Sequence, residues 1–232
     1  MIWLYVDGVD SRDCGVFLRS VPSIISAEKD LEFVEIPGRA GTLTVDHGGY
    51  KDADITLECY VRDVANIGKA YQLLHGQRKV VFSSDPAHSY IATFYGQAQG
   101  DRVVRNMDAW EFTAPVRLKP FRYYEPAPGA VKFSASGGHI DNPASAPSAP
   151  RITITGTGDM QVMIGQYVME FDAVSGGVIV DSEIMRLMNM DGITNALEHD
   201  IDEFPLLEPG ENFIQWSGNI SSITIEPRWR DR

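Results

Sequence analysis

The sequence predicts a mainly β protein of two domains: an N-terminal antiparallel β domain with one packed α-helix, followed by a β-sandwich or jelly roll. Three observations support this fold class. Short apolar runs with period-2 alternation recur along the chain, one segment has the apolar spacing of a helix, and a proline-rich stretch divides the chain near its middle. At 232 residues the chain is long enough for two cores, since domains cluster near roughly 100–150 residues.

The N-terminal half contains a series of strand-like runs. They cover residues 3–6, 32–36, 42–45, 54–61, 79–82, 90–97 and 107–116. In the run 54–61, every second position is apolar or cysteine and the positions between are mostly polar, which is typical of a half-buried strand. Residues 46–50 carry two glycines between two of these runs, so we expect a hairpin connection there and antiparallel pairing around it.

One helix is expected at about residues 63–75. Its apolar positions fall three and four residues apart, at Val64, Ile67, Tyr71 and Leu74. Asp63 precedes them as a side-chain cap for the free N–H groups of the first turn, and Gly76 follows as a stop. One face of this helix should pack on the sheet, and residues 83–86 should form a turn between the next two strands.

Seven of the thirteen prolines lie between Pro115 and Pro150. Proline has no backbone donor, so this stretch should not run through the middle of a sheet. We therefore expect a boundary near residues 124–130 and domains of 1–126 and 127–232. The second domain has six short β runs separated by Gly, Asn and Asp, at residues 151–155, 160–164, 167–171, 178–181, 212–216 and 222–226. This density of short strands favours a sandwich or jelly roll.

The charge and composition exclude several classes of protein. The formal charge is −12, with −3 through Pro126 (14 Lys and Arg, 17 Asp and Glu) and −9 in the remainder (6 against 15). A protein that grips nucleic acid needs clustered Lys and Arg, so nucleic acid is not expected as a bound ligand. No apolar run is long enough to span a membrane, and the first residues lack the pattern of a secretory signal. Cys14 and Cys59 are too few for a disulfide framework.

The sequence shows little apparatus for chemistry. Five histidines are scattered without metal-ligand spacing, at His47, His75, His88, His139 and His199. Nucleotide-binding glycine loops and a nucleophile elbow are absent from the sequence, so we expect no catalytic, cofactor or metal site. The most enzyme-like pair is Asp181 with Glu183, which could act as acid and base in glycoside hydrolysis if they share one face of a strand. The alternative interpretation is an exposed polar edge in an acidic domain.

A second hypothesis is a carbohydrate-binding module. The segment 139–143 (HIDNP) resembles the sugar-binding strand of galectins, and Trp216 could serve as a stacking platform. The arginine and the acidic residue that complete that pattern are absent. Trp216 also alternates with neighbours in a way that fits a buried strand, which would place it in the core.

An ordered set of motifs carries one further resemblance. The segment 35–43 (EIPGRAGTL) is followed by 49–52 (GYKD), the expected helix, 79–86 (KVVFSSDP) and the strand that ends at residue 115. In the second half, Asn142-Pro, 150–156 (PRITITG), 180–183 (VDSE), 207–212 (LEPGEN) and 216–218 (WSG) follow in order. Together these motifs resemble the distal tail proteins of long-tailed, siphovirus-type bacteriophages or prophages, over nearly the whole chain. The matching turn-forming residues are Ile36, Pro37, Gly38, Arg39, Gly41, Asp85 and Pro86.

This resemblance implies a non-enzymatic structural hub of the virion, at the tip of the phage tail. Such proteins form a hexameric ring that joins the tail tube protein to a tail-tip, tail-fibre or tail-associated lysin protein and to a receptor-binding protein or adhesin. Their N-terminal domains line a channel through which DNA passes without specific binding, and their galectin-like C-terminal domains project outward. No cofactor and no membrane is implied. The chain is compact for the family, so an additional sugar-binding insertion is not expected.

Overall fold

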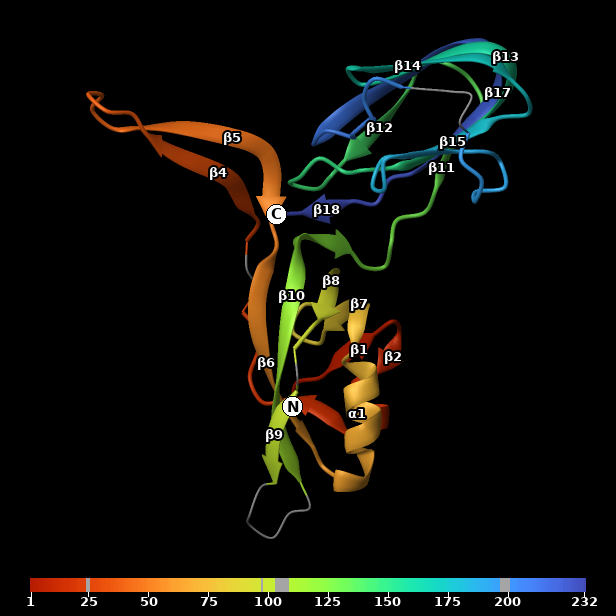
Figure 1. Cartoon of the computed structure of the whole chain (residues 1–232). Helices are drawn as coiled ribbons and strands as arrows, with labels where there is room; N and C mark the ends of the chain where they lie inside the picture. The colour runs from red at the N-terminus through yellow and green to blue at the C-terminus, as the bar shows by residue number, and fades with distance from the viewer. Residues whose placement is uncertain (24–25, 97, 103–108, 197–200) are drawn as a thin grey trace. The chain divides into compact units, whose positions relative to one another are not determined.

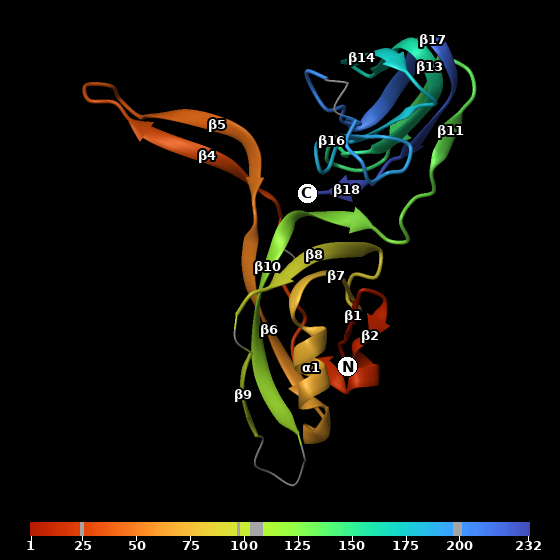
Figure 2. The ribbon, with the colours of Figure 1, turned by 45° about the vertical axis from the view of Figure 1, so that its right-hand side comes forward.

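The computed structural model describes residues 1–23, 26–96, 98–102, 109–196 and 201–232. The chain forms two compact units, residues 1–125 together with Arg232, and residues 126–231 (Figures 1 and 2). Both are built from antiparallel strands, and one short α-helix belongs to the first unit. The predicted mainly β fold class is therefore confirmed.

The first unit is centred on a sheet with the order β2-β1-β7-β8-β10-β6-β3, to which β9 adds by pairing with β10. The strands are β1 (Leu4–Val6), β2 (Val9–Asp10), β3 (Val16–Leu18), β6 (Ala53–Val61), β7 (Gly76–Phe82), β8 (His88–Phe94), β9 (Gln99–Arg102) and β10 (Trp110–Tyr124). A 3-10 turn, η1 (Ser11–Cys14), lies between β2 and β3. Ala70 and Leu74 bring the helix into the same apolar core as the inward-facing residues of these strands.

The helix lies where the sequence predicts it, with a tighter first turn. Asp63 accepts a hydrogen bond from the Ala65 N–H at 2.9 Å and so caps a 3-10 turn, η2 (Val64–Asn66), which leads into α1 (Ile67–Leu73). Gly76 has a φ of +70°, a conformation that glycine adopts easily, and it begins β7 three residues after Leu73, the last residue of the helix.

A separate two-stranded sheet belongs to the first unit and consists of β4 (Glu28–Glu35) and β5 (Thr42–Lys51). The expected hairpin connection at residues 46–50 is wrong, because these residues lie inside β5, with Asp46 and Tyr50 paired to β4. The glycines serve a β-bulge instead: the register shifts between Lys29 and Leu31, and Gly48 with a φ of +76° absorbs the extra residues. The turn of the hairpin lies at residues 36–41.

Two prolines lie inside β10, between β8 and β6, so the expectation that the proline-rich stretch avoids the middle of a sheet is wrong at these positions. Pro115 lies at the interval where the neighbouring strand changes from β9 to β8. Pro120 lies between Leu118 and Arg122, where the register with β8 shifts, and beyond the last residue paired with β6. Each proline therefore lies at an interruption of the ladder, where a missing donor is tolerated.

The second unit is a curled sheet with the order β11-β17-β13-β15-β16, extended by β12 on β17 and β14 on β13. The strands are β11 (Val131–Phe133), β12 (Gly138–Asn142), β13 (Arg151–Ile164), β14 (Tyr167–Val174), β15 (Val178–Asp181), β16 (Arg186–Met188) and β17 (Gly210–Glu226), with a short β18 (Arg230–Asp231) near the end. Its core contains fully buried apolar side chains, among them Ile152, Ile154, Ile164, Met169, Phe171, Leu207, Ile214, Ile223 and Ile225. This arrangement fits the predicted β-sandwich.

Strand length in the second unit differs from the expectation. The runs 151–155 and 160–164 belong to one strand, β13, and the runs 212–216 and 222–226 belong to another, β17. Glycines between the runs bend the strands at irregularities without ending them. Gly156 and Gly218 lie where the β13–β17 register shifts.

Candidate functional site

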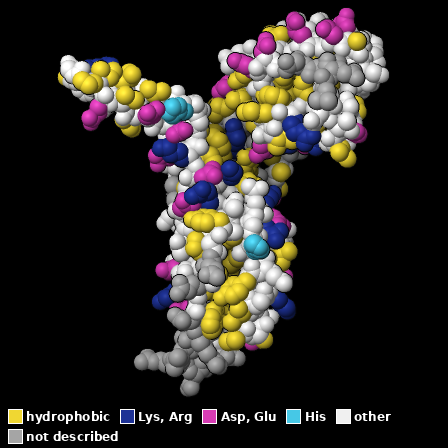
Figure 3. All heavy atoms as spheres, in the orientation of Figure 1, with side chains coloured by type: hydrophobic (Ala, Val, Ile, Leu, Met, Phe, Trp, Pro, Cys, Tyr) yellow, Lys and Arg dark blue, Asp and Glu magenta, His cyan; other side chains and the backbone are white. Residues whose placement is uncertain are grey.

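The hairpin of β4, residues 36–41 and β5, here called the arm, is the most unusual surface of the first unit. None of its side chains is buried, and three large apolar ones stand out in water: Phe33 is 63% exposed, and Ile36 and Leu43 are each 40% exposed. Figure 3 shows hydrophobic side chains beside acidic ones along the arm. An isolated two-stranded ribbon is marginally stable in water, so the arm is a surface that another molecule would stabilise.

Five of the residues predicted as family motif form the tip of the arm. The Arg39 N–H donates to the Ile36 carbonyl at 3.1 Å, which closes a turn with Pro37 and Gly38 at its centre. Gly38 has a φ of +82°, so the turn has the proline and the left-handed glycine of type II. Gly41, also at +82°, returns the chain to β5. Proline and glycine together fix the shape of the tip before any partner arrives.

Most charges along the shaft of the arm are paired across its two strands. Lys29 lies 2.8 Å from Asp46, Lys51 lies 3.3 Å from Glu28, and His47 lies 3.4 Å from Glu32. The hydrogen bond from Lys29 lowers the pKa of Asp46. The two charges at the tip, Glu35 and Arg39, have no ion-pair partner within the described residues.

The other two motif residues, Asp85 and Pro86, lie in the turn between β7 and β8 and do not join the arm tip. The Asp85 carboxylate contacts His88 Nδ1 at 2.8 Å and accepts from the Tyr90 hydroxyl at 2.9 Å. Burial opposes ionisation of Asp85, but these hydrogen bonds and the nearby Arg122 outweigh it, so its pKa is lowered. Burial, together with the hydrogen bond to Asp85, raises the pKa of Tyr90 to about 12. The cluster locks the turn.

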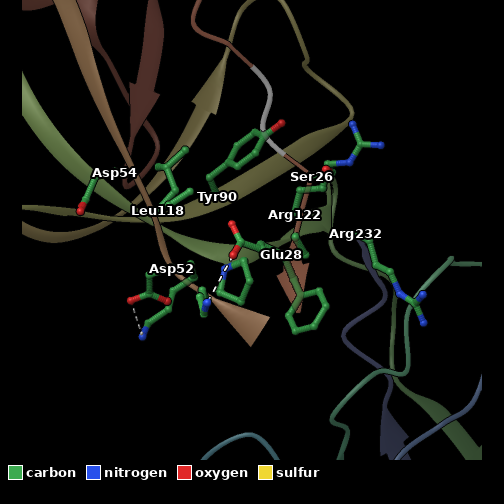
Figure 4. A pocket seen from close by; sticks show the side chains of 14 residues that line it. Ser26, Glu28, Asp52, Asp54, Tyr90, Leu118, Arg122 and Arg232 are labelled. Atoms are coloured by element: carbon green, nitrogen blue, oxygen red, sulfur yellow. Dashed lines mark hydrogen bonds and ion pairs between the residues drawn. The ribbon is translucent and has the colours of Figure 1, made fainter. Parts of the chain in front are cut away.

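A cavity of about 250 Å³ lies where the arm joins the sheet (Figure 4). Tyr90, Leu118 and Arg122 line it, and the final residue of the chain, Arg232, reaches it. Its carboxylates are ion-paired, with Glu28 to Lys51, Asp52 to Lys119 and Asp54 to Arg117. The hydrogen bond from Arg117 lowers the pKa of Asp54.

The pair Asp181 and Glu183 is not the acid–base pair considered from the sequence. Asp181 ends β15 and is buried, whereas Glu183 follows in a turn, so they do not share one face of a strand. Arg228 holds Asp181 through two hydrogen bonds, at 2.7 and 2.9 Å, and lies 3.1 Å from Glu183. Burial by itself would raise the pKa of Asp181, but the hydrogen bonds and the charge of Arg228 outweigh it, so this pKa is lowered. The general acid of a glycosidase must keep its proton, which requires a raised pKa. The lowered pKa of Asp181 instead fits a structural ion pair with Arg228.

The aromatic residue that faces water in the second unit is Phe213. Trp216 is half-buried. It is therefore neither fully in the core, as its alternation predicts, nor an open stacking platform. Phe213 is 51% exposed, and its ring centroid lies 6.4 Å from that of His139 on the neighbouring β12. Glu211 approaches the same histidine at 3.8 Å. Sequence reasoning missed Phe213, although its position one residue before the buried Ile214 places it on the outer face of β17.

Two asparagines in the motifs of the second half have structural roles. Asn142 is buried, donates to the Leu207 and Ala146 carbonyls and accepts from the Ala144 N–H. Asn212 is also buried, donates to the carbonyls of Glu208 and Gly210 and accepts from the Glu208 N–H. Each holds an irregular loop against the sheet, so the motifs that contain them preserve loop geometry.

A second hollow of the first unit, here called the α1 groove, lies between α1 and the β1–β2 turn. It measures about 380 Å³, and its lining includes the apolar side chains of Val9 and Leu73 and the cations of Lys69 and Arg78. Nothing in the sequence pattern pointed to it, because its walls come together only when α1 packs beside β1 and β7.

Across the described ranges, no group of three or more His, Cys, Asp or Glu side chains could hold a metal ion. His199 lies outside those ranges. No helix in the described part of the chain is long and apolar enough to cross a membrane.

Comparison with known proteins gives a match to a solved structure. No protein-family model matches the chain, and no curated protein sequence matches it. The fold is similar to the crystal structure of the Dit protein (gp 19.1) of phage SPP1, with a TM-score of 0.68 and 15% sequence identity. The alignment covers 97% of this chain and 98% of that one. That protein is described as a paradigm of the hub adsorption apparatus in phages that infect Gram-positive bacteria. The resemblance to distal tail proteins is thus confirmed as a shared fold.

Proposed function

We propose that this chain is a structural hub of a phage tail, located in the virion, with no enzymatic activity. The observation that carries the proposal is the shared fold across both units, since 97% of the chain aligns with a protein described as a hub of the adsorption apparatus. Fold alone does not establish function. The exposed arm and the paired carboxylates add support, because they fit a chain that binds other subunits and performs no chemistry.

The finer assignment is a hexameric ring at the tail tip that joins the tail tube protein to the host-adsorption apparatus. The N-terminal unit would form the ring and its channel, and the C-terminal unit would project toward a tail-tip, tail-fibre, lysin or receptor-binding protein. A closed ring also covers surfaces like the arm that a monomer would expose. DNA would pass through the channel without being held, since the chain carries a net charge of −12 and phosphate binding needs clustered cations.

Light scattering coupled to gel filtration tests the ring, followed by negative-stain microscopy. We expect a species of six times the 25.7 kDa chain mass, with a central hole. A chain that stays monomeric from micromolar to millimolar concentration, at low and high salt, would contradict the proposal. A purified tail tube protein from the same genome should bind the ring and not a monomeric variant.

A carbohydrate-binding role for the C-terminal unit is the second candidate function. The exposed ring of Phe213, beside His139 and Glu211, offers an apolar surface flanked by hydrogen-bonding groups. A glycan array probed with the full-length protein tests it. Binding to a cell-wall glycan that is lost in Phe213→Ala and kept in Val168→Ala, an exposed apolar residue of β14, would support the role. No binding at millimolar sugar would rule it out.

A further inference from the structure

The α1 groove has an apolar wall and one cation without a partner. Arg78 is already engaged, because it lies 3.1 Å from Asp7 and donates to the His75 carbonyl at 3.0 Å. Lys69 is exposed and has no ion-pair partner among the described residues. Val9, which is 45% exposed, and Leu73 supply the apolar wall. The groove therefore fits an apolar segment that carries one negative charge.

The arm tip has the complementary properties. Ile36 is 40% exposed, Pro37 follows it, and the unpaired carboxylate of Glu35 precedes them. The turn is closed by its own hydrogen bond and fixed by Pro37 and Gly38. A tip of fixed shape loses little conformational entropy when it binds, so a short apolar contact can still be favourable.

In both ribbon views the turn that joins β4 to β5 lies far from α1 and the β1–β2 turn, whose residues line the groove (Figures 1 and 2). When two different, well separated patches of one subunit meet head-to-tail, the contact is heterologous, and it closes a ring when the rotation between subunits permits. In a dimer with a two-fold axis, both tip-to-groove contacts would have to form at once between the same two copies. The positions of these two surfaces therefore favour a head-to-tail neighbour as the occupant of the groove.

We propose that the arm tip of one copy docks in the α1 groove of a second copy of the same chain, with Ile36 and Pro37 against the apolar wall and Glu35 paired with Lys69. This inference rests on the proposed ring and adds a contact to it. The contact is small compared with the roughly 1,200–2,000 Å² of a stable interface, so it strengthens a ring that other surfaces of the unit also hold.

Cross-linking offers a direct test, because Cys14 lines the groove and is partly accessible, whereas the other cysteine, Cys59, is buried. The variant Ile36→Cys should form a disulfide with Cys14 of the neighbouring copy under mild oxidation, giving a ladder of up to six chains on a non-reducing gel. The ladder should vanish in Ile36→Cys combined with Cys14→Ser. The matched control His47→Cys, on the shaft of the arm, should stay monomeric on the gel.

Charge reversal provides the second test. Glu35→Lys and Lys69→Glu should each raise the concentration at which the ring is half assembled by about tenfold or more, since like charges then meet at the contact. The double variant should recover most of the loss. Lys132→Glu, at an exposed lysine of β11, should leave assembly unchanged. Circular dichroism of each variant checks that the fold is kept.

The outcomes separate this contact from the ring itself. A wild type that forms hexamers, with no Cys14 cross-link and no effect of charge reversal, would overturn the docking contact and leave the ring in place. A wild type that stays monomeric would overturn both. Cross-linking with the predicted cysteine pair and rescue in the double variant would establish the contact.

Discussion

At the scale of single residues, the ion pair in the second unit gives the sharpest expectation. The Asp181 side chain is 6% exposed and its two hydrogen bonds come from Arg228. Removing one partner of such a pair leaves an uncompensated buried charge. We expect Arg228→Ala to lower the free energy of unfolding by about 3–5 kcal/mol, as measured by urea denaturation at neutral pH.

The pH dependence follows from the direction of the pKa shift. Asp181 has a folded pKa below its ordinary value of 3.8, so its contribution to stability is fully present above about pH 4 and is lost as pH falls through the folded value. The difference in stability between wild type and Arg228→Ala should therefore shrink in acid. Glu183→Gln, which removes a more exposed carboxylate, should cost less than Arg228→Ala. Equal losses in the two variants would show that Asp181 is not the principal partner.

Asp85 gives a second expectation at the same scale. Its carboxylate raises the pKa of Tyr90, although burial is the larger cause. In Asp85→Asn the tyrosine pKa should fall below about 12 and stay above its ordinary value of 10.0, because burial remains, as followed by NMR of labelled tyrosine rings at alkaline pH. Asp54→Asn removes a carboxylate that pairs with Arg117, and it should leave the Tyr90 titration unchanged. A Tyr90 pKa that does not move in Asp85→Asn would contradict the assigned contact.

The motif at residue 85 shows how much of such a site the sequence can predict. The Ser-Ser-Asp-Pro pattern is sufficient to predict a turn, because proline and aspartate favour turns through their own local geometry. The same pattern does not predict the partners of Asp85. Tyr90 and Arg122 lie opposite one another only through the pairing of β8 with β10, across a register irregularity. A one-residue change in that register would separate them, and short-range patterns do not fix it.

At the scale of elements, glycines decide where long strands bend. Gly218 and Gly210 both lie in β17 with similar φ angles, +94° and +92°. A Cβ at Gly218 would lie 2.4 Å from the Asp159 carbonyl oxygen, whereas a Cβ at Gly210 would meet nothing within 4 Å. Both substitutions to alanine share the backbone strain of roughly 1–2 kcal/mol, and only the first adds a clash with the backbone.

We therefore expect Gly218→Ala to destabilise the protein clearly more than Gly210→Ala in thermal or urea unfolding. The two sites lie in the same strand and have similar φ angles, so they share the same backbone strain. The difference between the two losses therefore measures the cost of the clash with β13. Similar losses at both sites would mean that the bulge relaxes to admit a methyl group.

Element boundaries show where sequence patterns fail and why. The pattern of Gly48 and Gly49 predicts a turn, yet Gly48 lies at a bulge in β5, because glycine adopts a positive φ in both settings. The hairpin turn lies at residues 36–41, where Pro37 and Gly38 belong to the family motif. The prolines from Pro115 onward predict that the sheet ends, whereas Pro115 and Pro120 each fall at a local interruption of the β10 ladder and the strand continues. Glycine and proline predict an irregularity in the backbone, whereas pairing with the neighbouring strand determines whether it is a turn, a bulge or the end of a strand.

At the scale of the whole molecule, the mainly β class and the single helix were predictable, because alternation and capping are local properties. The arm and the α1 groove were not, since both are defined by what lies around them. The arm has ordinary strand residues but no second sheet to cover it. The groove joins η1, α1 and β7, which are distant in sequence. In the proposed ring another copy completes both surfaces, and the sequence pattern of one chain does not specify such a contact.

The division into two units, each with its own buried apolar residues, leads to the last prediction. If the first unit forms the ring, a fragment of residues 1–125 should assemble into hexamers, because it contains both the arm and the α1 groove. A fragment of residues 126–232 should remain monomeric, helped by the excess acidity of that half, whose net charge of −9 makes copies repel one another. Light scattering of both fragments and of the full chain at equal molar concentration tests this. Hexamers formed by the second fragment, with a monomeric first fragment, would transfer the ring interface to the C-terminal unit and contradict the assignment made here.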